Sequence, residues 1–252
     1  MNSRAAKALA LLLVCLTAAC SNNSGFKKAS PAVPASTNMQ LAIEYLRLGK
    51  LAAARDFIEQ ALKEDPSNPD VQMTAGLVYE RLTDLKRAER AYATGYRLGK
   101  DDPNIQNTYA GFLCRTGKAV EGEKLFVQVA RSPLYQTPEV ALINAGVCVR
   151  STGDLVDAER YFNQALAIRP NLPEALLQLG NIELDRGDAG QARDSVIRYL
   201  ASNPATSEVL WLGFRAERKL GNAAAAAGYA RRVQAEFPNS EQAQMLRSGV
   251  DR

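Results

Sequence analysis

Few side chains in this sequence could do covalent or metal chemistry, and the cysteines are the first to consider. The 252 residues include four cysteines, at positions 15, 20, 114 and 148, and no histidine. A chain without histidine cannot run a Ser-His-Asp or Cys-His relay, and it lacks the commonest metal ligand. The composition therefore argues against most hydrolase mechanisms and most zinc sites. We expect neither a metal nor a cofactor.

Carboxylate pairs are the other groups that could do acid–base chemistry. Glu64-Asp65 and Asp101-Asp102 each directly precede a proline. Acidic side chains at such helix boundaries usually serve in turns and helix caps. The sequence also contains no glycine-rich phosphate loop of the strand–loop–helix form. It therefore predicts no active site, no small-molecule substrate and no enzymatic activity.

The first residues are typical of an export signal. Residues 1–19 contain Arg4 and Lys7, then an apolar run, and then small residues ahead of Cys20. The apolar run is shorter than the about 20 residues that span a bilayer, so a cleaved signal peptide is expected. The segment that ends at Cys20 resembles the bacterial lipobox, with Thr17 at the place that leucine usually holds. The resemblance implies that Cys20 is lipidated, and the alternative is an ordinary signal with an incidental cysteine.

The following residues are expected to form a tether. Residues 20–36 are rich in Ser, Asn, Ala and Pro and have too little apolar surface to offset the entropy of folding. Ser21 follows Cys20 where aspartate would resemble an inner-membrane retention signal, so the lipobox resemblance favours the periplasmic face of an outer membrane. The formal net charge of +4 is too small to argue for a nucleic-acid partner.

A period of 34 residues organises the rest of the chain. It separates Gly153, Gly187 and Gly221, and it also separates prolines 170, 204 and 238. Apolar residues recur at helical spacing between these marks, and glycine and proline suit helix ends, so each unit is predicted to be a helical hairpin. The units resemble tetratricopeptide repeats. The resemblance implies an all-α, right-handed superhelix over residues 37–252, with repeats at about 35–68, 69–103, 104–138, 139–172, 173–206 and 207–240 and then a C-terminal capping helix.

Two cysteines remain after the leader and the lipidation site. Cys114 and Cys148 are an even pair in an exported, oxidising compartment, and they lie on the first helices of adjacent units. Their positions within the two units differ by one residue, which is about 100° around a helix, so the side chains can face each other. Neighbouring helices are close enough for a disulfide where small residues line the contact. A Cys114–Cys148 disulfide is therefore predicted, and two buried free thiols are the alternative.

The repeat resemblance also predicts a binding surface. In tetratricopeptide repeats the first helices line a concave groove. The positions that usually point into it correspond here to Met39, Ile43, Leu46, Met73, Leu77, Phe112, Ile143 and Val147. An exposed apolar groove usually marks a site for a protein partner. The alternative for any single residue is that it packs between repeats.

The whole chain, from the lipobox to the Cys114/Cys148 pair, resembles the PilF/PilW family of type IV pilus biogenesis lipoproteins. The resemblance implies a pilotin, which binds a pilus secretin subunit and promotes its outer-membrane localisation and multimerisation. The partners would be the secretin and, through the lipid anchor, the membrane. The alternative is an adaptor lipoprotein that recruits another envelope complex, such as peptidoglycan machinery.

Overall fold

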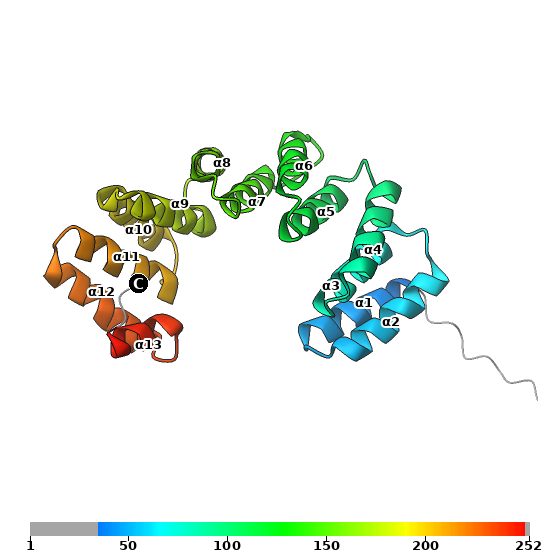
Figure 1. Ribbon diagram of the computed structural model, residues 1–252, viewed down its shortest axis with the longest axis horizontal. Coiled ribbons are helices and arrows are strands. Elements are labelled where there is room, and N and C mark those ends of the chain that lie inside the picture. The colour runs from blue at the N-terminus through cyan, green and yellow to red at the C-terminus, as the bar shows by residue number, and fades with distance from the viewer. Residues whose placement is uncertain (1–34, 250–252) are drawn as a thin grey trace, which may run out of the picture. The chain divides into compact units, whose positions relative to one another are not determined.

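The computed structural model describes residues 35–249, which form thirteen α-helices and no strand (Figure 1). The predicted signal peptide (1–19), Cys20 and nearly all of the predicted tether (20–36) lie outside the described residues. The helices are α1 (Ala35–Arg47), α2 (Leu51–Glu64), α3 (Pro69–Arg81), α4 (Leu85–Leu98), α5 (Pro103–Arg115), α6 (Ala119–Arg131), α7 (Pro138–Arg150), α8 (Leu155–Ile168), α9 (Pro173–Arg186), α10 (Ala189–Ser202), α11 (Ser207–Lys219), α12 (Ala223–Glu236) and α13 (Glu241–Ser248).

The first twelve helices pack as six antiparallel hairpins that follow one another in chain order. Each hairpin contacts the next, and α13 packs on α11 and α12. The prediction of an all-α superhelix that ends in a further helix is confirmed. The Ser240 hydroxyl accepts a hydrogen bond from the backbone N–H of Ala243, at 3.1 Å, so the last helix has a side-chain N-cap.

Proline defines where most of the first helices begin. α5 and α7 begin at Pro103 and Pro138, one residue before the predicted unit boundaries at 104 and 139. Proline suits the first helical position because the N–H that it lacks has no partner there in any helix. α1 likewise begins at Ala35, two residues before the predicted start of the repeat domain.

The turn inside each hairpin needs one residue with positive φ. Five turns place a glycine there: Gly49, Gly117, Gly153, Gly187 and Gly221. The turn between α3 and α4 instead places Thr83 at φ 60°. A β-branched residue is strained in this region, because its side chain crowds the neighbouring carbonyl oxygen.

Replacing Thr83 by glycine is therefore expected to raise the free energy of unfolding by about 1 kcal/mol. The hydrogen bond lost is only the one that the Thr83 hydroxyl donates to the neighbouring Leu82 carbonyl, at 2.6 Å. Urea unfolding followed by circular dichroism measures the change. The matched control is Gly117→Thr, because Gly117 has a φ of 84° and open space around an added Cβ. This variant should lose a similar amount of unfolding free energy. A Thr83→Gly variant less stable than the parent would show that the turn is not strained.

Small residues let the two helices of a hairpin approach each other. Ala54, Ala88 and Ala158 are fully buried on the second helices. On the first helices, a Cβ added to Gly76 or Gly146 would lie 2.7 Å from the ring of Tyr92 or Phe162. Aromatic rings therefore fill the space that the small residues leave, as in other close-packed helix pairs.

The buried residues form two clusters that meet at α5. One runs from Ala42 to Phe112 and the other from Ala110 to Ala243, so α5 contributes to both. No helix within residues 35–249 is long and apolar enough to cross a membrane. A cavity lies along α5 and along helices on both sides of it.

Candidate partner-binding site

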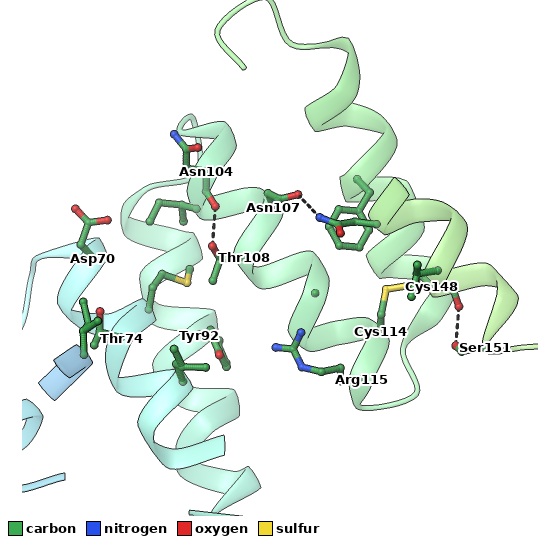
Figure 2. Close-up of a pocket in the computed structure, with 18 of the residues that line it drawn as sticks. Asp70, Thr74, Tyr92, Asn104, Asn107, Thr108, Cys114, Arg115, Cys148 and Ser151 are labelled. Atoms are coloured by element: carbon green, nitrogen blue, oxygen red, sulfur yellow. Dashed lines mark hydrogen bonds between the residues drawn. A yellow bond between two sulfur atoms is a disulfide. The ribbon is translucent and has the colours of Figure 1, made fainter. Parts of the chain in front are cut away.

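A cavity of about 770 Å³ opens along the first helices α1, α3, α5 and α7 (Figure 2). Tyr92 of α4 and Phe126 of α6 complete its wall. We call it the first-helix cavity. It is lined by Met39, Ile43, Asp70, Met73, Thr74, Leu77, Tyr92, Asn104, Ile105, Asn107, Thr108, Gly111, Cys114, Arg115, Phe126, Asn144, Val147, Cys148 and Ser151.

Five of the eight residues predicted to line a groove lie in this cavity. Met39, Ile43, Met73 and Leu77 form its apolar part on α1 and α3, and Val147 contributes from α7. Leu77 and Val147 expose 38% and 43% of their surface. Large exposed apolar side chains that gather in one concavity are what a partner site requires.

The prediction is wrong for the other three residues. Leu46, Phe112 and Ile143 are 7%, 1% and 8% exposed, and none of them lines the cavity. Leu46 and Phe112 pack in the cluster that begins at Ala42, and Ile143 packs in the other. The Phe112 ring lies against the Tyr92 ring, with centroids 4.5 Å apart. These side chains therefore pack between helices.

Polar residues on α5 and α7 line the rest of the cavity. The Asn144 amide donates to the Asn107 side-chain oxygen at 3.2 Å, and the Thr108 hydroxyl donates to the Asn104 carbonyl at 2.9 Å (Figure 2). The prediction missed these residues, although the repeat period could have found one of them. Asn107 lies 34 residues after the predicted Met73.

A charged network ties α3, α4 and α5 together beside the cavity. Arg115 donates two hydrogen bonds to the Glu80 carboxylate, at 2.6 and 3.0 Å, and the Tyr92 hydroxyl donates a third at 2.9 Å. Burial raises the pKa of Glu80, but the hydrogen bonds from Arg115 and Tyr92 outweigh it, so the net pKa is lowered. Burial, with the nearby Glu80 charge, raises the pKa of Tyr92. Glu80 is therefore ionised at neutral pH and fixes the Arg115 side chain.

The structure contains the Cys114–Cys148 disulfide that the sequence predicts, which joins α5 to α7 with the two Cα atoms 5.5 Å apart. Both cysteines line the cavity, and Figure 2 shows the bridge at one end of it and Asp70 at the other. Gly122 of α6 makes room for the bridge. A Cβ there would collide with the Cys114 sulfur and lie 2.9 Å from the Ala110 carbonyl oxygen.

The buried carboxylates lie outside the cavity and have structural partners. Glu139 accepts from Arg169 at 2.7 Å, and Glu183 accepts from the Ser195 hydroxyl at 2.8 Å. Burial raises the pKa of Glu183. Within residues 35–249 no three acidic or cysteine side chains gather in a way that could hold a metal ion.

Comparison with known proteins establishes the family. Residues 39–103 and 150–217 match the tetratricopeptide repeat family. The crystal structure of PilW, described as a widely conserved type IV pilus biogenesis factor, is 31% identical, with a TM-score of 0.74, over 84% of this chain and 97% of PilW. The chain belongs to the PilF/PilW family.

Other relatives agree with this membership. The type IV pilus assembly protein PilF of Pseudomonas aeruginosa is 22% identical over 202 residues, which cover 80% of each chain. The structure of that PilF is similar in fold, with a TM-score of 0.69 and 21% identity over 85% of this chain and 97% of PilF. Cellulose synthase operon protein C of Pseudomonas fluorescens is 25% identical over 66% of this chain but only 13% of its own length, so there only the repeats are shared.

Proposed function

We propose that this chain is an outer-membrane lipoprotein that binds a pilus secretin subunit and promotes its localisation and multimerisation for type IV pilus assembly. The observation that carries the proposal is an apolar first-helix cavity in a member of the PilF/PilW family. The partner segment would place apolar side chains against Met39, Ile43, Met73 and Leu77. Asn107 and Asn144 would hydrogen-bond to its backbone, because carboxamides both donate and accept.

The size of the apolar surface suits a moderate affinity. Burying one aliphatic side chain completely contributes about 1.5 to 3 kcal/mol, before the cost of ordering the peptide. A few such side chains would reach micromolar binding. A lipid on Cys20 would hold the chain at the same membrane as the secretin and raise the effective concentration, so that this affinity is sufficient. The Met39 side chain, which is only partly buried, can adapt to an irregular partner surface.

Replacing Cys20 by alanine tests the membrane part of the proposal. Stable anchoring takes more than one acyl chain, and the lipidated cysteine would supply them. We expect the variant to leave the membrane fraction, to lose labelling with an alkynyl palmitate analogue, and to reduce secretin multimers in the outer membrane. Immunoblots of separated membranes measure the location and the multimers, and coupling of the alkyne to a fluorescent azide measures the label. The control is Cys15→Ala, which keeps Cys20. A Cys20→Ala chain that keeps its label and its membrane association would rule out the anchor.

The proposal assigns no catalytic step, no cofactor and no nucleic-acid partner. The alternative is an adaptor that recruits another envelope complex, such as peptidoglycan machinery. The observation in favour of this alternative is that similar repeats occur in the cellulose synthase operon C proteins. Affinity purification from detergent-solubilised envelope separates the two, since the proposal requires the secretin subunit to co-purify.

A further inference from the structure

A second cavity lies on the other set of helices. Two adjoining depressions, of about 650 and 230 Å³, share Val127, Arg131 and Tyr161 and lie between α6 and α8, with Leu142 of α7 beneath them. We call them together the second-helix cleft. None of their lining residues belongs to the first-helix cavity. The cleft therefore offers a surface that the proposed function does not use.

The smaller of the two depressions has a small side chain in its wall where most other repeats have a large one. The twelfth residue is large and apolar in four of the second helices, and it packs against the core: Leu62 in α2, Tyr96 in α4, Leu166 in α8 and Leu200 in α10. In α12 it is the exposed Gln234. The same position in α6 is Ala130, which lines the cleft. The connection from α6 to α7, residues 132–137, is also two residues longer than the other connections between hairpins.

The charges in the cleft leave two cations available. Within residues 35–249, the side chains of Lys124 and Arg131 make no ion pair or hydrogen bond. The other charged groups are already engaged. Glu123 accepts from the Tyr161 hydroxyl at 2.6 Å, and Arg160 pairs with Asp157 at 2.9 Å and stacks on the Tyr161 ring. The Glu123 carboxylate keeps its charge, so the three cations of the cleft and the two carboxylates, with Asp157 included, leave one net positive charge.

We propose that the second-helix cleft binds a peptide segment of a protein partner in which an apolar side chain is flanked by carboxylates. The apolar side chain would enter the space beside Ala130 and Val127, and the carboxylates would pair with Lys124 and Arg131. Val120, which is 80% exposed at the rim, would extend the apolar contact. The chain would then hold two partners at once, one on its first helices and one on its second helices.

The test uses a fluorescein-labelled peptide, Glu-Asp-Leu-Phe-Asp-Glu, and a counterpart with lysine at every acidic position. Fluorescence anisotropy measures their binding to the repeat domain, residues 35–252 with the disulfide intact. Ala130→Leu fills the cleft with a side chain that three other repeats carry at this position, so the fold should tolerate it. A Lys124→Glu, Arg131→Glu double variant reverses the charge at exposed positions.

The matched control is Arg90→Glu with Arg97→Glu. These residues occupy the equivalent positions of α4, where Tyr96 stands in place of Ala130. We expect the acidic peptide to bind the parent and the control alike, and to bind Ala130→Leu and the charge-reversed variant at least tenfold more weakly. Three results would overturn the proposal: no binding by the parent, equal binding of the lysine peptide, or equal loss in the control. Binding of phosphatidylglycerol vesicles without binding of the acidic peptide would also overturn it, because the ligand would then be a lipid surface.

Discussion

Replacing Leu77 and Val147 together by glutamate is expected to abolish secretin multimers and pili while the fold stays intact. Both side chains line the first-helix cavity, from α3 and α7, and both are exposed enough for a carboxylate to stay hydrated. Each change would remove about 1.5 to 3 kcal/mol of apolar burial in the complex. Affinity for the secretin subunit should therefore fall by about a hundredfold or more. Calorimetry with the secretin's periplasmic region measures the affinity, and immunoblots measure the multimers.

The matched control places the same charges on exposed apolar positions outside the cavity. Leu85 of α4 and Ile197 of α10 are 53% and 54% exposed, so Leu85→Glu with Ile197→Glu alters net charge and surface hydropathy to the same extent. This variant should assemble multimers as the parent does. If the Leu77, Val147 variant also assembles them while its circular dichroism and unfolding match the parent, the cavity is not the secretin site.

Loss of the Cys114–Cys148 disulfide should produce the largest change in stability. The bridge closes a loop between residues 34 positions apart, and chain entropy makes such a closure worth about 3 to 4 kcal/mol. It also joins the first helices of adjacent hairpins, so its loss weakens one interface in a stack in which each hairpin is held by its neighbours. A Cys114→Ala, Cys148→Ala variant should unfold at a lower urea concentration than the parent. Dithiothreitol should lower the unfolding midpoint of the parent to that of the variant.

Gly122 provides an independent check on this prediction. Because an added Cβ meets the Cys114 sulfur, Gly122→Ala should cost more stability in the oxidised parent than in a Cys114→Ala, Cys148→Ala background. The Ala110 carbonyl contact is common to both backgrounds and cancels in the comparison. Equal unfolding midpoints for the oxidised and reduced parent would show that the bridge does not stabilise the stack. Equal costs of Gly122→Ala in the two backgrounds would show that the glycine does not serve the bridge.

The repeat architecture could be predicted because the residues that begin and end its helices act locally. Glycine in the turns and proline at the helix starts act within a few residues of their own position, and both recur every 34 residues. The small errors arose at Pro103 and Pro138, where proline is the first helical residue itself. Thr83 also takes the positive φ of the turn without the glycine that marks the others.

The site was predicted less well because it depends on contacts between repeats. A register carried from one repeat to the next placed Met39, Ile43, Met73 and Leu77 correctly in the cavity. The same register wrongly placed Phe112 in the cavity, because the Phe112 ring packs against the Tyr92 ring instead. The Glu80–Arg115 pair joins residues 35 positions apart, and no local sequence pattern predicts it. Such contacts depend on how each helix is rotated against its neighbours.

Site-specific photo-crosslinking in living cells tests the central claim most directly, which is that the first-helix cavity holds the pilus secretin subunit. Benzoylphenylalanine would replace Leu77 in the cavity and, as a control, Leu85 on α4, which is exposed but outside the cavity. We predict a covalent adduct between this chain and the secretin subunit from position 77 and none from position 85. No secretin adduct from position 77, or equal adducts from both positions, would contradict the account.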